Sequence, residues 1–187
     1  MLLAVFLVTH LSAHLFAILG PQSHTDALAA IQWVYRYSVV EAVLIAAFAM
    51  QIMLGLRLAI FRWADRRSSA WASMQLFSGI YLLLFILNHS ISALIARYGL
   101  GLETGFAWVS TPLNTPLVQW FFYPYYALAV CSLCVHIGAA LHFRGRPRLA
   151  KALSFLGVPI AAAYLASFGG WIYPVEPVAT YQDIYTF

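Results

Sequence analysis

The stretch Trp71–Arg97, WASMQLFSGIYLLLFILNHSISALIAR, decides the fold class of this chain. Before Arg97 it contains no Asp, Glu, Lys or Arg. It is also longer than the roughly 20 helical residues that cross the ~30 Å hydrocarbon core of a bilayer. Four other apolar stretches are long enough for a span, so we predict an all-α integral membrane protein with five transmembrane helices at Met1–Leu19, Ala27–Trp63, Trp71–Arg97, Leu117–Phe143 and Leu149–Ile172.

The composition of the 187-residue chain excludes a water-soluble fold, since 63% of the residues are hydrophobic and only 9% are charged. A soluble domain carries about 25% charged residues, and a disordered chain is poorer in hydrophobic residues. The net charge of +4 does not indicate nucleic-acid binding, because the chain has no soluble basic face to carry it. We expect one membrane domain over residues 1–187 in a lipid bilayer, with a tail at 173–187.

Two of the apolar stretches differ from a simple span, one by its length and the other by its position at the start of the sequence. Ala27–Trp63 is too long for one crossing, and we expect it to protrude or tilt. Met1–Leu19 has the length of a signal peptide, but it lacks a basic start and carries His10 and His14 inside its apolar part. We therefore expect it to be retained as a span.

The basic residues predict the orientation of the chain in a cytoplasmic membrane. Most of the ten Lys and Arg residues follow the second or the fourth apolar stretch, whereas Arg36 and Arg97 fall at the opposite edge. By the positive-inside rule, the N-terminus is then cytoplasmic and the C-terminus lies outside. The residues at the predicted inner edge are Arg57, Arg62, Arg66, Arg67, Arg144, Arg146, Arg148 and Lys151.

Ionisable residues inside a membrane span are costly to bury and are functional candidates by default. At a rise of about 1.5 Å per residue, His89 lies roughly 12 Å inside the predicted outer edge, and His10 and His14 lie about 15 and 9 Å from that edge. His136 and Gln51 lie about 12 and 9 Å from the inner edge. The outer layer therefore has imidazoles on two helices, and the inner layer has one imidazole.

The outer layer has the ligand set of a haem. A six-coordinate b-type haem iron takes two imidazoles, one on each side of the ring plane, and the core of a helical bundle is a usual place for it. We therefore expect a haem-type bundle with His10 and His89 as ligands. His14 shares a helix face with His10 and can replace it. The alternative that each histidine is a hydrogen-bonded core residue stays open, above all for His136.

Three other kinds of polar residue have simpler interpretations. His24 lies at a predicted interface, where we expect it to be solvated. Cys131 and Cys134 are expected to be small apolar-like side chains in a helix rather than metal ligands. Glu41 is either in an ion pair with Arg36 or a proton acceptor near a quinone.

With these residues in view, the chain resembles the five-helix cytochrome b membrane anchors of succinate:quinone and quinol:fumarate oxidoreductases. The first matching segment is His10–Phe16, HLSAHLF, where the family has the ligand motif H-L-[ST]. The second is Gln75–Gly79, QLFSG, with His89 ten residues later, where the family carries Q-R-x-S-G and a haem-ligating His at that spacing. The third is His136–Ala140, HIGAA, similar to the ligand segment of the fourth helix. The likeness covers about residues 9–144.

The chain also departs from this family at two positions. Diheme members pair helix 1 with helix 3 and helix 2 with helix 4, and their helix 2 ligand falls on Gln51 here. The basic residue of Q-R-x-S-G falls on Leu76. The resemblance therefore implies at most one haem b, in the outer layer. Arg36 and Arg97 fall at the edge where the propionates of that haem would need cations.

The expected function is that of an anchor subunit in a membrane-bound oxidoreductase of the respiratory chain. It would hold soluble flavin and iron–sulfur subunits at the cytoplasmic face and pass electrons to or from quinone. The chain has no flavin fingerprint and no four-cysteine cluster motif, so we expect it to be non-catalytic itself. The alternative is a haem-free structural subunit of a larger membrane complex. A third hypothesis, a stand-alone haem protein that moves electrons across the bilayer, needs two haems, and Gln51 disfavours it.

Overall fold

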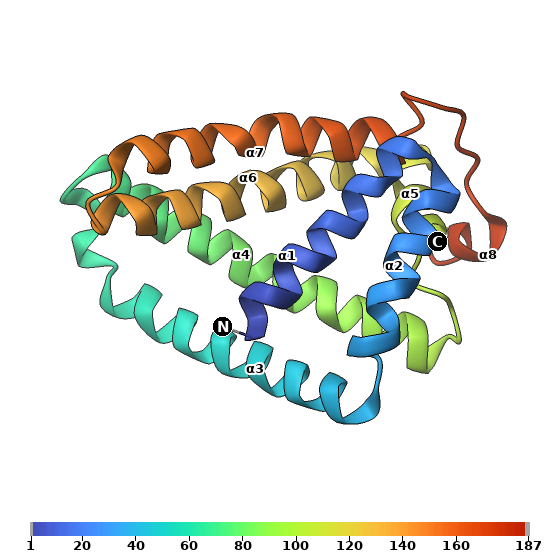
Figure 1. The fold of residues 1–187 in the computed structure, drawn as a ribbon, viewed down its shortest axis with the longest axis horizontal. Coiled ribbons are helices and arrows are strands. Elements are labelled where there is room, and N and C mark those ends of the chain that lie inside the picture. Colours follow the sequence, from blue (N-terminus) through green and yellow to red (C-terminus); the bar gives the residue numbers. More distant parts are fainter. Residues whose placement is uncertain (1, 186–187) are drawn as a thin grey trace. The chain divides into compact units, whose positions relative to one another are not determined.

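The computed structural model describes residues 2–185, and every regular element in this range is a helix (Figure 1). Five stretches of helix are long and apolar enough to cross a membrane, which confirms the predicted fold class at this level. By length and composition they make the chain a multi-pass membrane protein. They are Leu2–Leu19, Ser38–Phe61, Ala70–Gly99, Gln119–Phe143 and Pro147–Phe168.

The connections between successive helices are mostly short. The long helices are α1 (Leu2–Leu15), α2 (Pro21–Tyr35), α3 (Ser38–Phe61), α4 (Ala70–Leu94), α6 (Gln119–Phe143) and α7 (Pro147–Phe168). The remaining elements are single turns and short helices, of which the last lies within the predicted tail. They are η1 (Phe16–Leu19), η2 (Ala64–Arg67), η3 (Ile95–Gly99), α5 (Phe106–Asn114) and α8 (Ala179–Gln182).

The stretch Ala27–Trp63 does not form one long helix, so its predicted bounds as a single span are wrong. α2 ends at Tyr35, and α3 begins at Ser38. In the turn between them, Arg36 forms an ion pair with Glu103, with 3.1 Å between Nη1 and Oε2. The break therefore lets a guanidinium reach a carboxylate instead of remaining inside a continuous apolar helix.

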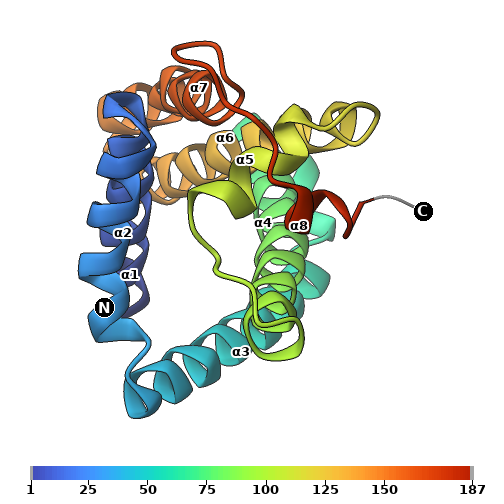
Figure 2. The ribbon, with the colours of Figure 1, turned by 90° about the vertical axis from the view of Figure 1, so that its right-hand side faces the viewer.

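The described chain folds into two compact units, and the first contains residues of the ranges 1–50, 94–123 and 163–187. In this unit α1 and α2 lie side by side (Figure 2). Tyr164 Oη donates a hydrogen bond to the backbone oxygen of Leu11 at 2.6 Å. Asn114 Nδ2 donates to the backbone oxygen of Phe168 at 2.8 Å. These bonds tie the last turns of α7 to α1 and α5.

The second unit contains residues 51–93 and 124–162. Its parts of α6 and α7 lie side by side, with glycines at their close contacts (Figure 1). A Cβ atom on Gly138 would lie 2.8 Å from the backbone oxygen of Ala150, and one on Gly157 would lie 2.9 Å from Cβ of Cys134. Small residues of this kind let membrane helices approach closely. Cys134 is buried here, in agreement with its interpretation as a small apolar side chain.

Candidate functional site

Three histidines of the first unit form one continuous row of hydrogen bonds. His10 Nε2 lies 3.2 Å from His14 Nε2, and His14 Nδ1 lies 2.9 Å from His24 Nε2. A neutral imidazole has one donor and one acceptor nitrogen. His14 therefore donates to one neighbour and accepts from the other, and it joins α1 to α2. The predicted i, i+4 relation of His10 and His14 holds in this row.

His24 is the member of the row that the sequence interpretation missed. It was expected to be solvated, but its exposed fraction is 0%, so that expectation is wrong. Its ring makes edge contacts with Phe106 and Phe168, with centroids 5.7 and 5.1 Å apart. Burial lowers the pKa of His24 to about 4, which keeps the ring neutral at pH 7. The signal for its burial was Leu28, which is also buried and lies one helical turn further along α2.

The surroundings of His10 are aromatic, but its Nε2 is engaged by another ring. Phe6 stacks on His10 with ring centroids 5.2 Å apart, and Tyr35 lies edge-on at 6.5 Å. The donor chemistry of His10 and His14 suits a haem iron. Their arrangement does not, because the Nε2 atoms of the two rings face one another at 3.2 Å. A haem on either ring would require that side chain to turn away from its neighbour.

The charged residues of the first unit pair differently from the prediction. Of the two alternatives for Glu41, the ion pair with Arg36 is wrong, and the role as a proton acceptor near a quinone stays a prediction. Glu41 Oε1 instead accepts from Arg97 Nη1 at 2.6 Å, and Tyr98 Oη donates to Glu41 Oε2 at 2.6 Å. Arg36 pairs with Glu103. Both candidate partners of haem propionates thus already bind a carboxylate.

His89 belongs to the second unit, in an aromatic and polar stretch of α4. Phe85 stacks on His89 with ring centroids 5.3 Å apart, and it also contacts Tyr125 at 4.8 Å. Asn88 Nδ2 donates to Tyr125 Oη at 3.0 Å. His10 and His89 fall in different units, and their pairing across a haem stays a prediction.

A hydrogen bond holds the ring of His136 against α4, and it also defines which ring nitrogen carries the proton. Its Nδ1 lies 3.1 Å from the backbone oxygen of Gln75 and 3.3 Å from Ser78 Oγ. Because a carbonyl oxygen only accepts, Nδ1 carries the proton, and Nε2 is the acceptor nitrogen of the neutral ring. A Cβ atom on Gly79 would lie 3.0 Å from His136 Cε1, so the glycine allows this close approach. Two of the three segments that carry the resemblance therefore lie in contact.

The two departures from the family pattern differ in their environment. Leu76 is buried, with an exposed fraction of 8%, and Gln51 is exposed. Within residues 2–185, no hydrogen bond joins Gln51 to His136. The predicted pairing of these two residues in an inner layer stays a prediction.

Neither metal-ligand geometry nor a known relative adds a second line of evidence for a cofactor. Among the described residues, no group of three or more His, Cys, Asp or Glu side chains has the arrangement to hold a metal ion. A scan against protein-family models and searches of curated proteins and solved structures find no match.

Proposed function

We propose that the chain is the cytochrome b-like membrane anchor subunit of a succinate dehydrogenase or fumarate reductase type complex. The observation that carries the proposal is the contact of His136 with Gln75, Ser78 and Gly79. These residues come from two separate segments of the family pattern, and a chance likeness in sequence gives no reason for them to meet. In this role the chain lies in a cytoplasmic membrane and passes electrons between soluble flavin and iron–sulfur subunits and quinone.

The cofactor part of the proposal is one haem b in the outer layer. His10 and His89 are its proposed ligands, with His14 as the substitute for His10. A bound haem would supply reversible one-electron chemistry between the partner subunits and the quinone. Arg36 and Arg97 would serve its propionates by exchanging their present carboxylate partners. Glu41, now held by Arg97 and Tyr98, is the proposed proton acceptor near the quinone.

The second candidate function is a haem-free structural subunit of a larger membrane complex. The histidine row favours it, because His10 and His14 satisfy each other and His24 completes the row. Three imidazoles hydrogen-bonded in this way stabilise the contact of α1 and α2 without a cofactor. The absorption spectrum of the purified chain separates the two candidates, since only a haem gives a Soret band.

The proposed orientation gives a direct prediction for the two ends of the chain. A reporter that is active only outside the cytoplasm, fused at the C-terminus, should be active, and the same reporter at the N-terminus should be inactive. The physical reason is the retention of Lys and Arg at the cytoplasmic face. Alkaline phosphatase activity of the two fusions in intact cells is the measurement. Equal activity of the two fusions, or activity only at the N-terminus, contradicts both the orientation and the cytoplasmic docking of partners.

The basic loops Arg62–Arg67, after α3, and Arg144–Lys151, after α6, are the proposed docking surface for the soluble subunits. Reversal of charge in the double variant Arg66→Glu, Arg67→Glu should reduce the flavin that co-purifies with the tagged chain by about tenfold, because like charges opposed across an interface cost several kcal/mol. The control is Arg66→Lys, Arg67→Lys, which keeps the charge and should keep the flavin. Undiminished flavin in the glutamate variant contradicts this docking surface.

A further inference from the structure

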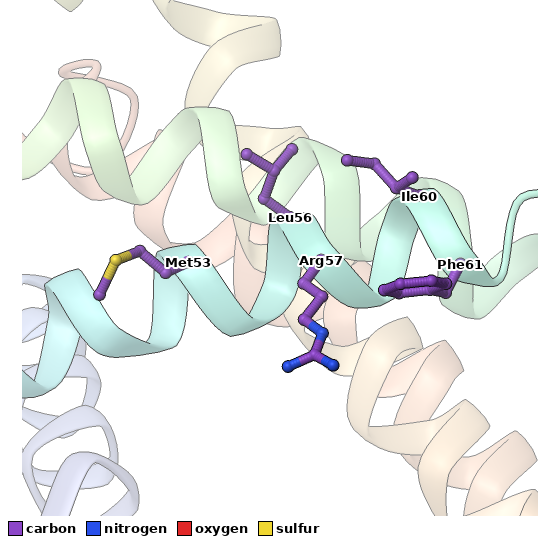
Figure 3. Close-up of a pocket in the computed structure, with 5 residues that line it drawn as sticks. All are labelled: Met53, Leu56, Arg57, Ile60 and Phe61. Atoms are coloured by element: carbon purple, nitrogen blue, oxygen red, sulfur yellow. The ribbon is translucent and has the colours of Figure 1, made fainter.

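The last three turns of α3 carry an apolar pocket with one cation in it. Its lining residues are Met53, Leu56, Arg57, Ile60 and Phe61, whose side chains project from one helix (Figure 3). Their spacing of three and four residues places them in one stripe along α3. The apolar members are exposed, with fractions of 52–70%. Since α3 is long and apolar enough to cross a membrane, an exposed apolar stripe on it suits contact with lipid chains.

Among residues 2–185, Arg57 has no anionic partner that would offset its position in this stripe. The ion pairs formed within residues 2–185 are Arg36–Glu103 and Arg97–Glu41, and neither includes Arg57. Its guanidinium carbon instead lies 5.6 Å from the centre of the Phe61 ring. A charged side chain inside a span is costly unless its head reaches the polar interface or an opposite charge.

The depth of Arg57 matches the headgroup region of the bilayer. Arg57 lies four residues before the end of α3 at Phe61, which is about 6 Å along the helix axis. A long arginine side chain covers such a distance, and the Phe61 contact directs the guanidinium toward that end. Trp63 follows directly, at the level where aromatic side chains line membrane interfaces.

The residues around the C-terminal end of α3 are mostly basic, so this region attracts anions. Arg62 and Arg67 are exposed, and Arg66 lies over the Trp63 ring at 4.5 Å. Asp65 is the one acidic residue in the range 57–67, which contains four arginines. Basic clusters beside a membrane helix attract anionic lipids, and a guanidinium binds the two oxygens of a phosphate in a fork.

We propose that this pocket binds an anionic glycerophospholipid of the surrounding bilayer. Its phosphate binds Arg57, and one acyl chain lies along Met53, Leu56 and Ile60. The charge selects an anion, and the apolar stripe selects a lipid over free phosphate. The inference does not depend on haem or on the identity of partner subunits, and it goes beyond either candidate function.

The test is native mass spectrometry of the purified chain in detergent, titrated with dioleoyl-phosphatidylglycerol or dioleoyl-phosphatidylcholine. The first bound phosphatidylglycerol should have at least about fivefold higher affinity than phosphatidylcholine, because one arginine near the surface contributes about 1 kcal/mol to anionic lipid binding. Arg57→Gln should abolish this preference. Arg57→Lys should retain part of it, since a lysine keeps the charge without the bidentate fork.

The matched control is Arg148→Gln, which removes an exposed arginine from the first turn of another candidate span, Pro147–Phe168. This variant should keep the preference for phosphatidylglycerol. Equal losses in Arg57→Gln and Arg148→Gln would show general attraction to basic residues and overturn the site. Competition by glycerol 3-phosphate at the lipid's own concentration would overturn the acyl contact. If Arg57→Gln does not fold, Ile60→Ser probes the same pocket, and an unchanged phosphatidylglycerol affinity in Ile60→Ser contradicts the proposal.

Discussion

The Gly138→Leu variant is expected to lower the apparent melting temperature of the purified protein by about 5–10 °C. Overpacking a tight contact costs about 1–3 kcal/mol, and a chain of this size loses roughly 2–4 °C per kcal/mol. A Cβ atom on Gly138 would meet the backbone oxygen of Ala150 at 2.8 Å and would also strike Ser154 Oγ. Ser154 Oγ donates to that same backbone oxygen at 2.9 Å, so neither group moves freely. The contact of α6 with α7 must therefore open.

The matched control for this prediction is Gly55→Leu. Gly55 also lies inside a membrane-length helix, but the nearest side-chain atom to its Cβ position, on Leu83, is 3.7 Å away. That is an ordinary contact distance, and leucine is the better helix former by somewhat less than 1 kcal/mol. Thermal unfolding followed by circular dichroism in the same detergent measures both variants. Equal melting temperatures for Gly138→Leu and Gly55→Leu would contradict the close packing of α6 on α7.

The spans were predictable because the membrane imposes a length and an apolar composition on each of them. Four of the five predicted stretches, such as Trp71–Arg97, correspond to single long helices or helical runs of the structure. The relation of His10 to His14 was predictable as well, since a helix puts residues four apart on one face. Features that depend on a single helix and its membrane surroundings could thus be predicted from the local sequence.

Contacts between distant segments were not predictable in the same way. The nearby Arg36 was one of two alternatives for Glu41, but Arg97, fifty-six positions away, binds it. His24 was taken for an interfacial residue because it falls between the predicted spans Met1–Leu19 and Ala27–Trp63. Arg36, in the turn between α2 and α3, pairs with Glu103, which lies in a loop far along the chain. Such pairings follow from tertiary packing, which cannot be derived from the spacing of residues along one helix.

The histidine row also changes how the haem proposal has to be tested. Depth in the membrane predicted that His10 faces a partner across the bundle, and it could not predict that His24 enters the same cluster. The row gives His10 and His14 a hydrogen-bonding role that needs no cofactor. A substitution of either residue therefore disturbs the protein with or without haem. His89, which is outside the row, is the cleaner probe of iron ligation.

Replacing the proposed ligand of α4, in His89→Ala, is expected to abolish the low-spin haem spectrum completely. A low-spin b haem needs two strong axial nitrogens, and the loss of one leaves a high-spin, weakly held haem. The matched control is His136→Ala, at another histidine of the second unit. His136 Nδ1 donates to the backbone oxygen of Gln75, which leaves Nε2 as the acceptor nitrogen, but the proposed inner layer offers only the weak amide of Gln51 as a second ligand. This variant should leave the low-spin spectrum nearly intact.

The number of haems per chain follows from the same count of imidazoles. Each low-spin haem takes two, and only α1 and α4 offer candidates at one predicted depth, so the chain should bind at most one. A side-chain amide at Gln51 does not supply the field of a second imidazole, and the buried, apolar Leu76 brings no cation for inner propionates. A pyridine haemochrome assay with independent protein quantification gives the stoichiometry. Two haems per chain would refute the single outer site. Zero haems, together with an intact histidine row, would favour the structural subunit. The row would then explain why these three imidazoles lie inside the first unit.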